Sequence, residues 1–181
     1  TMFLVVLGHV STFCLGLYGS DTFSYTVLIK QFRMPLFFFV SGFVFFKHEF
    51  VWSLSNALHF LRKKTTVQIL SPALFLIAFC TVSHLSLVDA LFDYQKGGYW
   101  FTFTLFEYFC FYIFFQQVIR MVRMNSILED VFLLTMGGVI YMLTIYSIIA
   151  RYQLNSGFCA LIGVATWHNF LFFLIGTRVR K

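Results

Sequence analysis

Ionisable side chains inside apolar segments are the features of this sequence that could do chemistry, because such groups are costly in a hydrocarbon environment. His9 lies near the middle of an apolar run at the amino terminus. A neutral imidazole accepts a proton near neutral pH, which suits a general base acting on a hydroxyl group. A histidine that is hydrogen-bonded to a neighbouring helix fits the same position. His9 is therefore a candidate catalytic residue with a structural alternative.

Glu107 is the one carboxylate in a second apolar run, which Trp100 opens. It could pair with His9, with Arg33 or with a cation near the outer face. A structural hydrogen bond between helices is the stronger alternative to direct chemistry. His168 could likewise make a polar contact between helices without any further role. The other three histidines are expected near the membrane surface, at His48, His59 and His84.

A basic cluster, Arg62, Lys63 and Lys64, follows a segment whose apolar residues recur at helical spacing. This pattern predicts an amphipathic helix over residues 51–66, lying along the inner face of a membrane. The cluster could bind anionic lipid headgroups, or the phosphates of a donor such as coenzyme A. Its plainest role is to set the topology of the neighbouring spans.

The composition indicates a polytopic membrane protein. The chain has 181 residues, of which 60% are hydrophobic, 22% aromatic and 11% charged. A soluble domain carries about 25% charged residues, so a soluble enzyme is excluded, and disordered chains are poor in aromatic residues. The net charge of +6 fits a membrane topology better than nucleic-acid binding. The four cysteines show no CxxC spacing, so neither a metal site nor disulfides are predicted.

Apolar runs between charged breaks predict a single all-α domain, a bundle of six membrane helices covering residues 1–181. Residues 27–33 could lengthen the second span, in which Pro35 would kink the helix. With the first span starting inside, nine basic residues face the cytoplasm and four face outward. This bias predicts a multi-pass protein of the cytoplasmic membrane with both ends of this chain inside. The six predicted spans are residues 1–18, 34–46, 67–85, 100–119, 131–150 and 158–176.

Two pairs of small residues are expected to allow close packing of membrane helices, as small side chains do. They are Ser41 with Gly42 in the second span and Gly137 with Gly138 in the fifth. No internal repeat divides the chain. Packing is the expected role of both pairs.

Two sequence segments, taken together, form a pattern specific enough to indicate a family resemblance. LVVLGH at residues 4–9 is followed, some two dozen residues on, by FRMPLFFFVSGF at residues 32–43. The pair resembles the acyltransferase 3 family, the bacterial integral-membrane O-acyltransferases of the fucose-4-O-acetylase and O-antigen acetylase kind. A basic segment before a proline, a Tyr-Trp-Phe opening of the fourth span and an apolar ending before a basic tail follow in the family's order. The resemblance covers the whole chain.

The resemblance implies a reaction in which an acyl group, often acetyl, passes from cytoplasmic acyl-CoA to a hydroxyl of a sugar or polysaccharide outside. The family's first-helix histidine corresponds to His9, the expected general base. Its basic acyl-CoA motif corresponds approximately to the cluster at residues 62–64. No metal or bound cofactor is implied; the partners are the lipid bilayer, the donor and the carbohydrate acceptor. The expected supporting or substrate-facing residues are Arg33, Ser41, Trp100 and Glu107.

The chain departs from the family pattern in three ways. The family fold has about ten membrane helices of about 20 residues each, whereas six are predicted here. The family's arginine about ten residues before the histidine would precede Thr1. Its paired arginines before the proline are replaced by Thr65, Thr66 and Gln68. The resemblance is therefore to the amino-terminal part of such an enzyme, trimmed at both ends.

The sequence also fits two other functional classes of membrane protein. The chain could be a transporter or flippase-like bundle, in which His9 and Glu107 line a polar pathway. It could also be a non-catalytic unit that folds in the membrane. Only the first hypothesis, O-acyl transfer, predicts consumption of acyl-CoA.

Overall fold

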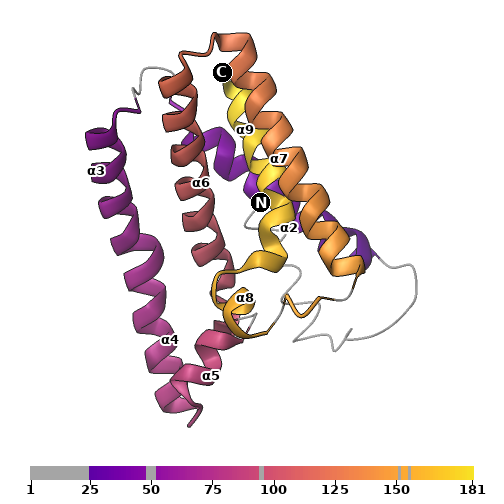
Figure 1. The fold of residues 1–181 in the computed structure, drawn as a ribbon. Coiled ribbons are helices and arrows are strands. Elements are labelled where there is room, and N and C mark those ends of the chain that lie inside the picture. The colour runs from indigo at the N-terminus through magenta and orange to yellow at the C-terminus, as the bar shows by residue number, and fades with distance from the viewer. Residues whose placement is uncertain (1–24, 48–51, 94–95, 151, 155) are drawn as a thin grey trace. The chain divides into compact units, whose positions relative to one another are not determined.

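The computed structural model describes residues 25–47, 52–93, 96–150, 152–154 and 156–181. All regular structure in these residues is helical, as the sequence predicts (Figure 1). The chain divides into two compact units, residues 1–47 with 172–181 (unit 1) and residues 48–171 (unit 2). The first predicted span and His9 lie outside the described residues.

Unit 1 contains α2 (Tyr25–Phe45) and most of α9 (Phe170–Arg180). The α2 helix extends well upstream of the predicted start at residue 34 and carries Pro35 inside it, so the proposed lengthening is confirmed. Near the ends of α2 and α9, an Arg180 guanidinium N–H donates to the Phe43 carbonyl oxygen at 3.0 Å.

Gly42 and Gly176 bring the backbones of α2 and α9 into direct contact. A Cβ atom at Gly42 would overlap the carbonyl group of Phe173, and one at Gly176 would overlap that of Phe39. The close approach expected at Gly42 is confirmed. Gly176 is the counterpart on the other helix, which the sequence did not single out.

Unit 2 opens with one continuous helix, Leu54–Val82. It consists of α3 (Leu54–Thr65), a π-helical turn η2 (Thr66–Leu70) and α4 (Ser71–Val82). The π turn is closed by the Ser71 N–H, which donates to the Thr66 carbonyl oxygen five residues earlier. The prediction of a separate surface helix ending before the third span is therefore wrong. The helix passes through the basic cluster without a break.

The π turn immediately precedes Pro72, which lacks an N–H and crowds the carbonyl group four residues before it. Single π turns of this kind occur often at functional sites. Here the turn contains Gln68, whose buried Oε1 has no hydrogen-bond partner among the residues that the structure describes. An unsatisfied amide oxygen of this kind destabilises the folded protein.

We expect Gln68→Met to raise the free energy of unfolding by about 1–3 kcal/mol, because it removes the desolvation penalty of that oxygen while keeping an unbranched side chain. Thermal or denaturant unfolding in detergent micelles measures the change. The control is Gln153→Met, at an exposed position, which should leave stability nearly unchanged. A loss of stability in Gln68→Met would mean that the amide has a required partner.

The next two long helices confirm that the fourth and fifth predicted spans are helical. They are α6 (Trp100–Val122) and α7 (Ser126–Ile149). The α7 helix begins at the N-cap Asn125, whose side-chain oxygen accepts a hydrogen bond from the Leu128 N–H at 2.8 Å. Such caps satisfy the free N–H groups of a first helical turn. The short α5 (Leu87–Phe92) and the 3₁₀ turn η3 (Lys96–Gly98) precede α6.

The sixth predicted span, residues 158–176, is not one helix. It is broken into α8 (Gly157–Leu161), the 3₁₀ helix η4 (Val164–Asn169) and α9. The break occurs at Gly163, whose φ of 63° lies in the left-handed region that glycine adopts without strain. As a result, η4 packs against α7 in unit 2, while α9 continues into unit 1.

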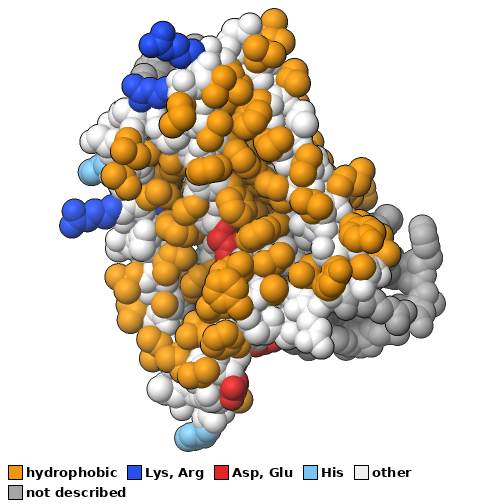
Figure 2. Space-filling view, viewed as in Figure 1, with side chains coloured by type: hydrophobic (Ala, Val, Ile, Leu, Met, Phe, Trp, Pro, Cys, Tyr) orange, Lys and Arg blue, Asp and Glu red, His pale blue; other side chains and the backbone are white. Residues whose placement is uncertain are grey.

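Three helices in the described residues are long and apolar enough to cross a membrane: Leu54–Val82, Trp100–Val122 and Ser126–Ile149. Large hydrophobic side chains stand exposed on them, including Val82 at 80% and Met142 at 68%. Figure 2 shows hydrophobic side chains over most of the face in view. These features are those of a membrane protein.

Candidate functional site

The structure separates the predicted site residues into two groups. Arg33 and Ser41 lie on α2 in unit 1, whereas Trp100 and Glu107 lie on α6 in unit 2. The basic cluster also belongs to unit 2, on α3.

Glu107 is a partly buried carboxylate whose direct partner is an indole group. The Trp167 Nε1–H donates to Glu107 Oε2 at 2.9 Å, joining η4 to α6. The Trp167 ring in turn packs edge-on against Phe111, with ring centroids 5.0 Å apart. This bond matches the structural alternative, a hydrogen bond between helical segments. The cation that interacts electrostatically with Glu107 is Lys96.

Lys96 is a buried lysine that sequence reasoning did not single out. Only 2% of its surface is exposed, and its ammonium group donates to the Ala160 carbonyl oxygen. Burial lowers its pKa from 10.5, and the charges of Glu107 and Asp93 oppose that shift. The only sequence feature that marks Lys96 is its position between a loop and the aromatic residues that begin α6. A lysine followed by two glycines otherwise indicates a solvated turn.

Two threonine hydroxyl groups lie near Glu107. Thr104 and Thr166 are 2% and 1% exposed, and their Oγ1 atoms are 3.1 Å apart. Tyr108 donates its hydroxyl proton to the Thr166 carbonyl oxygen at 2.6 Å. Gly163 faces this group: a Cβ atom there would stand 3.3 Å from Glu107 Oε2 and 3.4 Å from Thr104 Oγ1. We name Lys96, Thr104, Glu107, Thr166 and Trp167 the polar cluster.

The three residues predicted to bind acyl-CoA differ in their exposure and contacts. Arg62 and Lys63 are exposed, whereas Lys64 is half-buried. The Lys64 ammonium lies over two aromatic rings, 5.6 Å from the centroid of Phe60 and 5.5 Å from that of Phe109. Consecutive helical residues point in different directions, so two of the three basic side chains remain available for an anionic ligand.

Arg33 has a buried Nε atom for which the described part of the chain offers no hydrogen-bond partner. Beside it in sequence, Phe32 and Pro35 help to line an apolar groove of about 400 Å³ in unit 1. Ser41 is half-buried one residue before the glycine contact. The groove is also lined by Leu36, Phe39 and Phe172.

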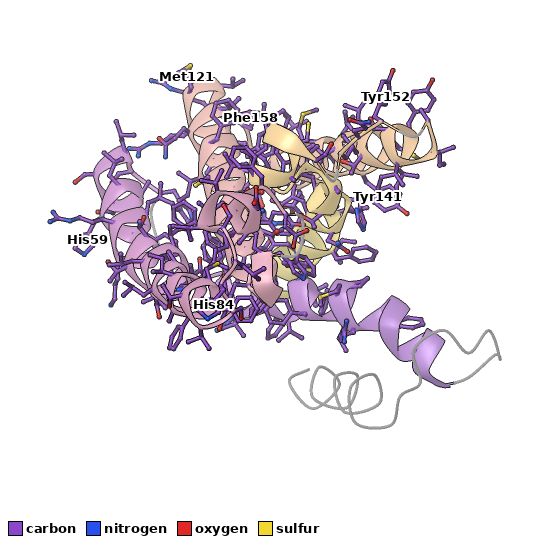
Figure 3. The ribbon with its side chains drawn as sticks, turned by 90° about the horizontal axis from the view of Figure 1, so that it is seen from below. His59, His84, Met121, Tyr141, Tyr152 and Phe158 are labelled. Atoms are coloured by element: carbon purple, nitrogen blue, oxygen red, sulfur yellow. The ribbon has the colours of Figure 1, made fainter. Side chains whose placement is uncertain are left out.

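The described histidines are not near a carboxylate cluster. His59 and His84 are exposed, and Figure 3 shows His59 at the outer edge of its helix. His168 shares a hydrogen bond between its Nδ1 and the Ala165 carbonyl at 3.0 Å, and its ring lies 6.4 Å from that of Tyr141. Within the described ranges, no group of three or more His, Cys, Asp or Glu side chains could hold a metal ion.

The polar cluster therefore combines an ammonium and a carboxylate with two threonine hydroxyls. The Thr166 hydroxyl donates to the Gly163 carbonyl oxygen at 2.7 Å and lies 3.1 Å from that of Thr104. Comparisons with models of protein families, with curated proteins and with solved structures give no match for this chain.

Proposed function

We propose that the protein is a membrane O-acyltransferase. In this proposal it moves an acyl group, acetyl in the simplest case, from cytoplasmic acyl-CoA to a hydroxyl of an extracytoplasmic sugar or polysaccharide. The acyl-CoA is a co-substrate, and the protein needs no bound cofactor. The catalytic base is His9, and the site lies in the cytoplasmic membrane of a bacterial cell.

The observation that carries the proposal is the combination of His9 in an apolar run with the RMPLFFFVSG segment at residues 33–42. That segment lies on α2, and its glycine allows backbone contact with α9. Three membrane-competent helices are consistent with an integral membrane enzyme. The family assignment itself rests on the sequence resemblance.

The exposed basic pair supports a donor site on the cytoplasmic side. Arg62 and Lys63 extend from α3 with no other role in the described contacts of their charged groups. Guanidinium and ammonium groups bind phosphates through charge-assisted hydrogen bonds. The phosphates of coenzyme A are the matching ligand. The positive-inside bias favours the cytoplasmic side, where acyl-CoA is made, for this basic pair.

The experiment is the binding of labelled acetyl-CoA to the protein in nanodiscs. We expect saturable binding that the double substitution Arg62→Ala/Lys63→Ala weakens by about tenfold or more, because two charge-assisted contacts are lost. The affinity should also fall with rising salt. Lys64→Ala should weaken binding less, since its ammonium is turned toward aromatic rings.

The control removes the same two charges elsewhere, by Lys47→Ala and Arg123→Asn. Both residues are exposed, and asparagine tolerates the left-handed backbone at position 123, where φ is 56°. Equal weakening in this control would mean that net charge alone attracts the donor. Flux driven by a pH gradient without consumption of acyl-CoA would instead support the transporter-like alternative.

A further inference from the structure

Two arginine side chains are held over aromatic rings where α2 and α9 end in unit 1. The Arg180 guanidinium lies 5.3 Å from the ring centroid of Phe43, and the Arg178 guanidinium lies 5.4 Å from that of Phe46. Arg180 Nη1 also donates to the carbonyl oxygens of Phe43 and Val44, at 3.0 and 3.3 Å. These carbonyls belong to the last turn of α2, where acceptors lack partners within the helix. The Arg180 guanidinium is therefore fixed at this end of α2.

Arg180 keeps hydrogen-bond donors for a further partner. A guanidinium carries five N–H groups, and the hydrogen bonds of Arg180 within the described residues come from Nη1. Its side chain is exposed, as is that of Lys47 just beyond α2. No Asp or Glu occurs in residues 25–47 and 172–181, the described part of unit 1. This end of unit 1 therefore attracts an anion, and the planar guanidinium fits the oxygens of a phosphate.

The apolar groove of unit 1 occupies the same face of α2. Its volume is about 400 Å³, and all of its lining residues are hydrophobic: Phe32, Pro35, Leu36, Phe39 and Phe172. Residues three or four apart share one face of a helix. The series 32, 36 and 39 therefore continues to Phe43 and Phe46, the two rings that carry the arginines.

The distances along α2 match those of a phospholipid in one leaflet. At about 1.5 Å per residue, the groove residues of α2 lie about 6–17 Å from Phe43 along the helix axis. One leaflet of the hydrocarbon core is about 15 Å thick. A phosphate bound at Arg180 would thus have its acyl chain at the level of the groove. The predicted topology puts this end on the cytoplasmic side, where basic residues next to a membrane helix bind anionic headgroups.

We infer that unit 1 binds an anionic phospholipid, whose phosphate contacts Arg180 and Lys47 and whose acyl chain lies in the groove. The inference goes beyond the proposed acyl transfer and does not depend on it. A zwitterionic lipid offers the same acyl chain, but its ammonium group would be repelled by the basic end of unit 1. A free headgroup phosphate lacks the chain that fills the groove. Both should therefore bind more weakly.

The test locates a lipid on the protein in phosphatidylcholine nanodiscs. These contain a small fraction of phosphatidylglycerol that carries a diazirine in its acyl chain. Irradiation attaches the chain to the residues beside it, and peptide mass spectrometry identifies them. We expect labelling within residues 32–39 and at Phe172. Added unlabelled phosphatidylglycerol should suppress this labelling, whereas glycerol phosphate should not.

Removal of the headgroup contacts is the first variant. Arg180→Gln with Lys47→Gln should lower groove labelling about tenfold or more, because charge-assisted hydrogen bonds to the phosphate are lost. The control removes two exposed charges from unit 2, by Arg62→Gln and Lys63→Gln. This control should leave groove labelling unchanged.

Filling the groove is the second variant. Leu36→Trp should lower groove labelling by a similar factor, since the larger ring occupies the space of the chain. Leu134→Trp on α7 is the matched control, because both leucines are 38% exposed. If Arg180→Gln fails to fold, Lys47→Gln and Leu36→Trp decide the test.

Three outcomes would overturn the inference. The first is equal groove labelling by a diazirine phosphatidylcholine, which would mean that bulk lipid alone covers the helix. The second is groove labelling that the Arg180 and Lys47 changes leave intact. The third is suppression by glycerol phosphate, which would mean that the basic end binds a soluble phosphate without the chain.

Discussion

Replacing His9 with alanine is expected to lower acyl transfer to the carbohydrate acceptor by about 10²–10⁴-fold, the usual contribution of a general base. The imidazole would take the proton of the sugar hydroxyl as its oxygen attacks the thioester carbonyl. The carbon–sulfur bond then breaks, and the coenzyme A thiolate leaves and takes up a proton, so the products are the O-acyl sugar and the free thiol of coenzyme A. The loss should appear in kcat, because the proton is transferred in the transition state rather than on binding. The assay follows labelled acetyl groups on the acceptor, with the protein in nanodiscs.

Two controls make the result specific. His59→Ala removes an exposed imidazole from α3 and should leave the rate unchanged. Acetyl-CoA affinity should be the same in the His9 variant, since the proposed donor contacts are made by Arg62 and Lys63. Unchanged glycan acylation in His9→Ala would remove His9 from the mechanism.

The long helices could be predicted from sequence because hydropathy over about 20 residues is enough to identify them. The runs at residues 100–119 and 131–150 become α6 and α7 with ends displaced by a few residues. The glycine contact at Gly42 was also predictable, since small residues allow close helix packing. Such signals are local, and the residues that carry them are adjacent in the chain.

Hydropathy could not predict where one predicted helix breaks or where two predicted helices form a single one. Arg62, Lys63 and Lys64 resemble the boundary of a span, yet the helix continues through them because Lys64 is accommodated over aromatic rings. Residues 158–176 are apolar throughout, so hydropathy gives no sign that the backbone turns at Gly163. Backbone conformation at one glycine depends on packing that composition does not record.

The polar cluster was only partly predictable for a related reason. Glu107 stands out as a carboxylate in an apolar run, but its partner Trp167 is 60 residues away. Lys96 is bound to a backbone carbonyl 64 residues later, and a carbonyl has no sequence signature. Sequence reasoning can therefore find the costly group, whereas the fold is needed to find what compensates it.

The second large effect is expected at the helix contact in unit 1. Gly42→Ala should lower the free energy of unfolding by about 1–3 kcal/mol, the usual cost of adding a methyl group to a filled interface. The new Cβ atom would meet the backbone of Phe173, which cannot rotate away as a flexible side chain can. Gly176→Ala should cost a similar amount, because its Cβ atom would meet the backbone of Phe39.

Gly138→Ala is the matched control, since a Cβ atom added to this helical glycine would have no neighbouring heavy atom within 4 Å. Alanine is the better helix former, so this variant should be neutral or up to about 1 kcal/mol more stable. Unfolding in mixed detergent micelles measures all three variants. The double variant at positions 42 and 176 should cost less than the sum of the single changes, because one separation of α2 from α9 relieves both overlaps. Equal stability of Gly42→Ala and Gly138→Ala would mean that the two backbones are not in contact.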